Sequence, residues 1–243
     1  MTTTVHPTDK TRPPVPAGPA DPLRRTAYVA GGLYLLTFLT SIPARVLKGP
    51  VLDDPNYIVG PGPDTGVLWG GFLDVLLALA CIGTAIALYP VVKRHNGALA
   101  LGFVASRILE AAIIVAGVVS LLSIVTLRQD VAGTAGTDDG TLVALGRSLV
   151  AAHGWASLFG PGLLAAVNAL LLGSLIYRSR LVPRAIPMLG LLGAPLLLAS
   201  VTATVFDVFD QFSAPALVAV LPVALWELSL GFWLVVKGFK PVL

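Results

Sequence analysis

The sequence predicts an all-α integral membrane protein, built as a bundle of six transmembrane helices with both termini in the cytoplasm. Hydrophobic residues make up 56% of the 243 residues, charged residues only 12%, and the mean hydropathy is +0.85. A soluble protein needs about twice that charged fraction, roughly 25%, to cover its surface. Long apolar runs recur along the chain, and Lys and Arg gather at alternate ends of these runs.

Six apolar segments reach the roughly 20 residues that a helix needs to cross the hydrocarbon core of a bilayer. They are residues 27–47, 67–92, 99–127, 148–177, 188–209 and 216–236. The runs are continuous rather than alternating, which favours helices over a β-barrel. We therefore expect residues 26–240 to form one transmembrane domain, with its two longest connections at 48–66 and 128–147.

The first 25 residues differ from the rest of the chain. They contain six prolines and no apolar run. Such a segment has little surface to bury, and it lacks the apolar core of a signal peptide. We expect residues 1–25 to form a disordered, Pro-rich cytoplasmic tail.

The distribution of basic residues predicts the orientation, because Lys and Arg are retained in cytoplasmic loops. With the N-terminus inside, eleven basic residues lie on the cytoplasmic side and three, Arg45, Lys48 and Arg128, lie outside. The eleven are Lys10, Arg12, Arg24, Arg25, Lys93, Arg94, Arg178, Arg180, Arg184, Lys237 and Lys240. The sequence therefore predicts a multi-pass protein of the cytoplasmic (plasma) membrane.

Three charged residues lie near the middle of predicted spans, where an unpaired charge is costly. Arg107 and Glu110 are three residues apart on the third span and so share a helix face, and Glu227 lies at a similar depth on the sixth. We expect the three to meet, with Asn168 of the fourth span completing the hydrogen bonds. One guanidinium beside two carboxyl groups predicts one ion pair and a second carboxyl group that can hold a proton. A purely structural ion pair and a functional proton or ligand site both remain open.

A second polar group is predicted toward the outer side. It comprises Asp74 of the second span, His153 of the fourth and Asp207 of the fifth. The simpler interpretation is that these side chains reach interfacial water, because polar groups near helix ends cost little. The break at Gly160-Pro161-Gly162 is expected to kink the fourth span.

Several classes of function are disfavoured by the sequence. The net charge of +3 does not indicate nucleic-acid binding, because the basic residues flank apolar runs rather than forming one patch. There is no HExxH, CxxC or Walker-type loop, and the only cysteine, Cys81, lies in an apolar run. We therefore expect no cofactor and no metal site.

The resulting expectation is a non-enzymatic membrane protein whose Arg-Glu-Glu cluster holds the bundle together and can bind a proton or small ligand. The alternatives are a small proton-coupled transporter, an intramembrane enzyme with carboxylate acid–base chemistry at Asp74 and His153, and an accessory or scaffold subunit. The lipid bilayer is the one partner that the sequence indicates; protein partners are not indicated.

Four stretches carry a resemblance to a known family. They are IALYPVVK at 86–93, RILE at 107–110, LVPR at 181–184, and the end of the chain through Leu221-Pro222, Glu227 and VKGF at 236–239. Over residues 24–240 the chain resembles a family of bacterial membrane proteins catalogued as domain of unknown function 4386. The resemblance implies a polytopic membrane protein in which Arg107, Glu110 and Glu227 are motif positions. Asp74 departs from the family's usual glutamate but keeps the acid. The resemblance implies no activity.

Overall fold

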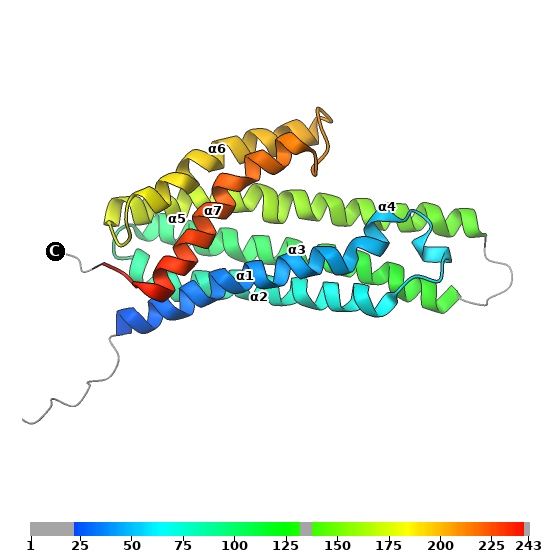
Figure 1. The fold of residues 1–243 in the computed structure, drawn as a ribbon, viewed down its shortest axis with the longest axis horizontal. Coiled ribbons are helices and arrows are strands. Elements are labelled where there is room, and N and C mark those ends of the chain that lie inside the picture. Colours follow the sequence, from blue (N-terminus) through cyan, green and yellow to red (C-terminus); the bar gives the residue numbers. More distant parts are fainter. Residues whose placement is uncertain (1–21, 132–137, 241–243) are drawn as a thin grey trace, which may run out of the picture.

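The computed structural model describes residues 22–131 and 138–240, which form helices and contain no strand (Figure 1). The helices are α1 (Pro22–Asp53), α2 (Asp64–Val92), α3 (Gly97–Val131), α4 (Asp139–Ser157), α5 (Ala165–Ser179), α6 (Ala185–Val205) and α7 (Ala214–Val236), together with a short 3₁₀ helix, η1 (Tyr57–Val59), and a π-helix, η2 (Leu158–Leu164). Because α4, η2 and α5 are continuous, six helical segments are long and apolar enough to cross a membrane. The predicted all-α bundle of six spans is confirmed.

The observed helices are longer than the apolar runs that predicted them. α1 continues to Asp53 and α4 begins at Asp139, so the predicted connections 48–66 and 128–147 are largely helical at their ends. The prediction ended each helix where the apolar run ends, but a capped helix can continue into water. Asp138 provides such a cap for α4, since its carboxylate accepts a hydrogen bond from the Thr141 amide at 3.0 Å. Hydrogen bonds from the Thr141 hydroxyl and amide lower the pKa of Asp138.

The last four residues of the predicted tail are helical. Residues 22–25 form the first turn of α1, and the remainder of the tail, residues 1–21, lies outside the described residues. Pro22 stands at the start of this helix, where its fixed φ suits the first turn and its missing amide N–H costs nothing.

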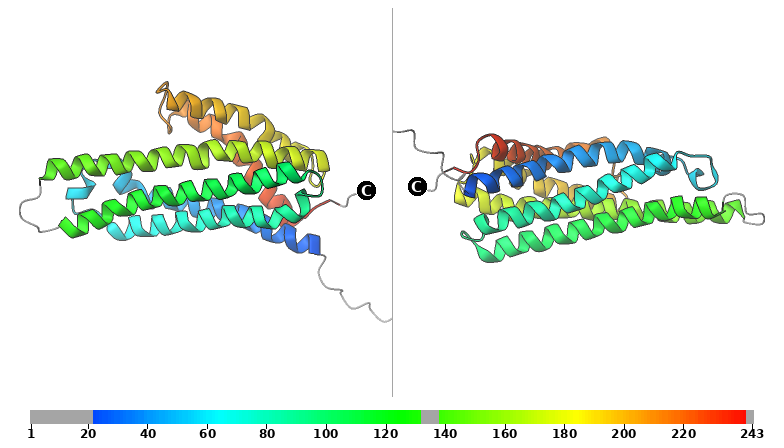
Figure 2. Two further views of the ribbon diagram at one scale, coloured as in Figure 1. Left: turned by 180° about the vertical axis from the view of Figure 1, so that it is seen from behind. Right: turned by 90° about the horizontal axis from the view of Figure 1, so that it is seen from below.

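The six segments run alternately between two ends of the bundle. We call the end with Pro22 and Val236 the terminal end, and the opposite end the distal end (Figures 1 and 2). α6 and α7 have 21 and 23 residues, about 32–35 Å at 1.5 Å per residue, which matches a hydrocarbon core of about 30 Å. The hairpin that they form stops short of the distal ends of α3 and α4 (Figure 1). α3, with 35 residues, is about 52 Å long at 1.5 Å per residue and so is about 20 Å longer than such a core.

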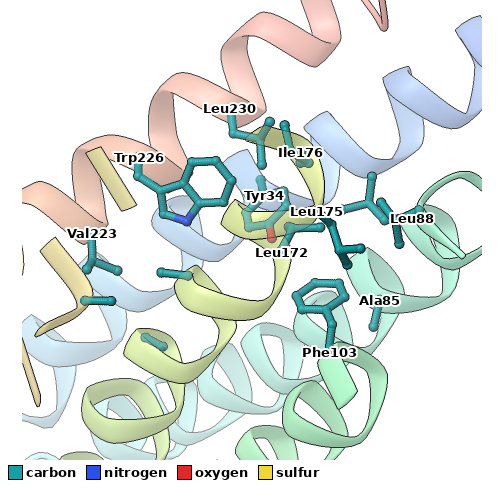
Figure 3. Packing of buried hydrophobic residues seen from close by; sticks show 14 of the residues in the cluster. Tyr34, Ala85, Leu88, Phe103, Leu172, Leu175, Ile176, Val223, Trp226 and Leu230 are labelled. Atoms are coloured by element: carbon teal, nitrogen blue, oxygen red, sulfur yellow. The ribbon is translucent and has the colours of Figure 1, made fainter. Parts of the chain in front are cut away.

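The main core lies in the terminal half of the bundle. Tyr34 of α1, Phe103 of α3, Leu172 of α5 and Trp226 of α7 meet there, and all are buried (Figure 3). Small residues allow the helices to come close enough for these side chains to meet. The indole of Trp226 packs against Gly190 of α6 so closely that a Cβ at residue 190 would lie 2.7 Å from the ring. Packing of this kind is the main force between helices in lipid, because lipid tails do not drive helices together.

A smaller core stabilises the distal extension. Val51, Tyr57, Ile58, Leu121 and Ile124 are buried together there. The Tyr57 hydroxyl donates to Asp64 at 2.8 Å, and Arg128 donates to the same carboxylate and to the Gly60 and Gly62 carbonyls. Burial, with the Asp64 carboxylate adding to it, raises the pKa of Tyr57 well above its usual value. The distal helix ends are thus held by their own packing and ion pairing.

Candidate functional site

The central cluster is built around the guanidinium of Arg107 on α3. Nη1 donates to Glu110 Oε2 at 2.9 Å, and Nη2 donates to Glu227 Oε1 of α7 at 2.6 Å. Asn168 Nδ2 of α5 donates to the same Glu110 oxygen at 2.8 Å. The structure therefore brings together the four residues that the sequence suggested, from three separate helices.

The position of the cluster follows from the pattern of α3. Phe103, Arg107, Glu110 and Ile114 recur at three- and four-residue spacing and are all buried, so they form the inner face of this helix. Arg107 lies ten residues after Gly97, and Glu227 lies nine residues before Val236. At 1.5 Å per residue both are about 14–15 Å from the terminal end, close to the middle of a bilayer.

Two further residues complete the cluster and were missed in the sequence. The hydroxyl of Tyr34 on α1 accepts a hydrogen bond from Arg107 Nη2 at 3.2 Å, and its ring centroid lies 5.3 Å from the guanidinium carbon. The thiol of Cys81 on α2 accepts from Nη1 at 3.6 Å. Tyr34 and Cys81 are polar side chains within apolar spans, which is the feature by which they could have been found in the sequence. Because neither side chain is charged, neither was selected. With them the cluster draws on α1, α2, α3, α5 and α7.

The charges of the cluster do not balance. Arg107 and Glu110 are 2% and 3% exposed, and the side chain of Glu227 is 16% exposed, so water screens these groups weakly. One guanidinium faces two carboxyl groups, which leaves one negative charge in excess if both are ionised. Among the described residues, Arg107 Nε and Asn168 Oδ1 have no hydrogen-bond partner. The cluster thus has one more acidic group than basic groups, together with one spare donor and one spare acceptor.

The predicted outer group is only partly assembled. Asp74 and His153 are buried and line one cavity, whereas Asp207 is exposed beyond the end of α6, with a left-handed backbone (φ 57°). Asp207 does not line this cavity, and its exposure agrees with the simpler interpretation that it reaches water. The expected fifth span, 188–209, ran past the helix, which ends at Val205. The prediction that Asp74 and His153 reach interfacial water is also corrected, because tertiary packing covers both.

The partner of Asp74 is Lys48, which we had expected in an outer loop. α1 continues through this position, and the buried Lys48 ammonium pairs with Asp74 Oδ2 of α2. His153 Nδ1 donates to the Gly117 carbonyl of α3 at 3.0 Å, since a carbonyl oxygen can only accept. Its Nε2 lies 3.5 Å from the Ser157 hydroxyl. Among the described residues, no three His, Cys, Asp or Glu side chains are grouped so that they could hold a metal ion.

The Lys48–Asp74 pair makes a testable prediction. Lys48→Met should lower the free energy of unfolding by about 3–5 kcal/mol, because it leaves the Asp74 carboxylate buried without its partner. The double variant Lys48→Met, Asp74→Leu removes both charges and should recover most of that loss. Unfolding of both variants can be followed in the same detergent. A double variant no more stable than the single one would contradict a paired role for the two residues.

Comparison with known proteins assigns the chain to a family. A family model described as "Domain of unknown function (DUF4386)" matches residues 29–238, which include the central cluster and all of the six spans except the first seven residues of α1. No curated protein and no solved structure matches the chain.

Proposed function

The chain belongs to the DUF4386 family, and from that premise we propose a non-enzymatic, multi-pass membrane protein whose central cluster joins the helices and carries one exchangeable proton. The observation that carries the proposal is the ratio of two carboxyl groups to one guanidinium in a buried site. A proton shared by the two carboxyl groups cancels the excess charge, and it can be given up when the surroundings change. Proton-coupled transport and acid–base catalysis stay predictions.

We further propose that the terminal end faces the cytoplasm of the cell. Nine of the described Lys and Arg residues lie at this end, at or beyond the helix ends. They are Arg24, Arg25, Lys93, Arg94, Arg178, Arg180, Arg184, Lys237 and Lys240. Of the described Lys and Arg residues, four lie in the distal half, namely Arg45, Lys48, Arg128 and Arg147. Retention of basic loops on the cytoplasmic side supports this orientation and a location in the cytoplasmic membrane.

Infrared spectroscopy tests the proton directly. In the purified protein in lipid nanodiscs at neutral pH, we expect a C=O stretching band of a protonated carboxyl group that shifts when H₂O is replaced by D₂O. Glu110→Gln and Glu227→Gln should each abolish it. Each variant leaves one carboxyl group beside Arg107, and a one-to-one pair is neutral when both members are ionised.

The matched control is Asp207→Asn, an exposed acid outside the cluster, which should leave the band unchanged. Absence of the band in the unmodified protein would contradict the proposal. So would a band that persists in both glutamine variants, because the proton would then reside elsewhere.

A further inference from the structure

A cavity of about 270 Å³ lies on the distal side of the central cluster. Its wall draws on α1, α2, α3, α4, η2 and the connection between α6 and α7. The volume is near the lower limit of small-molecule pockets, roughly 300–1,000 Å³. It is large enough for a small organic molecule but too small to enclose a phospholipid.

The polar wall of this cavity carries a net positive charge. Arg45 and Lys48 contribute two positive charges and Asp74 contributes one negative charge, before any charge on His153 is counted. Lys48 and Asp74 neutralise each other in their buried pair. Arg45 is therefore the cation of the wall that has no counter-ion within the cavity.

The contacts of Arg45 leave it able to bind a ligand. Its only described ion pair is a single contact of 3.4 Å to Asp53, and the two side chains are 42% and 68% exposed. Such exposed pairs contribute little, because water and salt screen them. The guanidinium carbon lies 5.1 Å from the centroid of Phe212, which also lines the cavity. The guanidinium of Arg45 thus packs against the ring of Phe212 and is not held by a strong ion pair.

The rest of the wall favours a ligand that is mainly apolar. Leu77, Ile114, Ala156, Pro161 and Phe212 contribute hydrocarbon surface. Ser41 and Gln211 can donate further hydrogen bonds, and the Lys48 ammonium has donors beyond the one directed to Asp74. A carboxylate fits these donors, and an apolar body fits the remainder of the wall.

We propose that this cavity is a binding site for a small monocarboxylate with an apolar body, whose carboxylate is bound by Arg45. This site is separate from the central cluster, and the inference does not depend on the proton proposed there. Arg45, whose side chain is 42% exposed, lies on α1 about one turn before Lys48, and both cations line the cavity.

The test uses radiolabelled hexanoate as the probe, with the protein in nanodiscs of zwitterionic lipid and empty nanodiscs as the blank. Saturable binding is expected in a scintillation proximity assay. Unlabelled hexanoate should compete, whereas hexanamide and hexylammonium should not. Arg45→Gln should weaken binding about tenfold or more, because it removes a charged hydrogen-bond donor.

Two further variants make the result specific to the cavity. Ser41→Leu keeps every charge but fills part of the space, so it should also weaken hexanoate binding. Arg147→Gln, which removes an exposed distal arginine outside this cavity, should have no effect. Thermal unfolding of each variant shows whether it is folded. Arg45 and Ser41 are both only partly buried, so we expect both variants to fold.

Three results would overturn the proposal. Hexanoate uptake that is no greater than in empty nanodiscs, or that is unaffected by Arg45→Gln, would show partition into lipid only. If hexylammonium displaced radiolabelled hexanoate more strongly than unlabelled hexanoate does, the cavity would prefer a cationic ligand, bound by Asp74 and His153. Loss of hexanoate binding on addition of phosphatidylglycerol to the nanodiscs would assign the cavity mouth to an anionic lipid.

Discussion

Arg107→Leu is expected to lower the free energy of unfolding by about 3–5 kcal/mol, because it leaves Glu110 and Glu227 in the protein interior without their shared cation. The same change removes the donor to Tyr34 and Cys81, so contacts between α3 and three other helices are lost together. Thermal or denaturant unfolding in a mild detergent measures the effect.

The triple variant Arg107→Leu, Glu110→Gln, Glu227→Gln separates charge from packing. It leaves no buried charge and should recover a large part of the lost stability. Arg147→Leu is the matched control, since this arginine is exposed, and it should change stability by no more than about 0.5 kcal/mol. If Arg107→Leu were as stable as the control, the cluster would not contribute to holding the bundle.

The second large effect is expected at the crossing of α1 and α7. A Cβ at Gly31 would lie 2.6 Å from the Gly231 carbonyl oxygen and 2.9 Å from Leu234 Cβ. The first of these atoms belongs to the backbone and cannot move without separating the helices. Gly31→Ala should therefore cost about 1–3 kcal/mol, although alanine is the better helix former.

The adjacent residue provides the control for this prediction. Gly32 is exposed, and apart from its chain neighbours and the adjacent helix backbone no described atom lies within 4 Å of a Cβ placed there. Gly32→Ala should be neutral or stabilise by up to about 1 kcal/mol, through helix propensity alone. Thermal unfolding of the two variants side by side measures the difference. Equal stability of the two would show that α1 and α7 are not in close contact.

The central cluster shows how far sequence reasoning reaches. Arg107, Glu110 and Glu227 could be selected because each is a charge at mid-membrane depth, where an unpaired charge is costly. Asn168 could be added as a polar side chain on a buried face. Tyr34 and Cys81 were not selected, because neither is charged and the sequence alone does not show which uncharged side chains face Arg107.

The distal cavity shows where sequence reasoning fails. Lys48 was expected in a loop, because the apolar run before it ends, yet α1 continues and buries it against Asp74. Asp207 was placed within the fifth span and in a possible outer polar group with Asp74, but α6 ends at Val205 and leaves Asp207 exposed. Hydropathy marks where lipid contact stops, whereas the end of a helix depends on caps and on packing against its neighbours.

The sequence by itself determined that this is an all-α membrane protein of six spans and where its central charges lie along each helix. Both follow from one-dimensional properties, namely the length of apolar runs and the cost of a charge within them. Only the tertiary structure decided which helices meet at Arg107, which residue pairs with Asp74, and that a cavity opens beside Arg45. These outcomes depend on helix rotation and on the close approach of small residues, for which a hydropathy pattern carries no information.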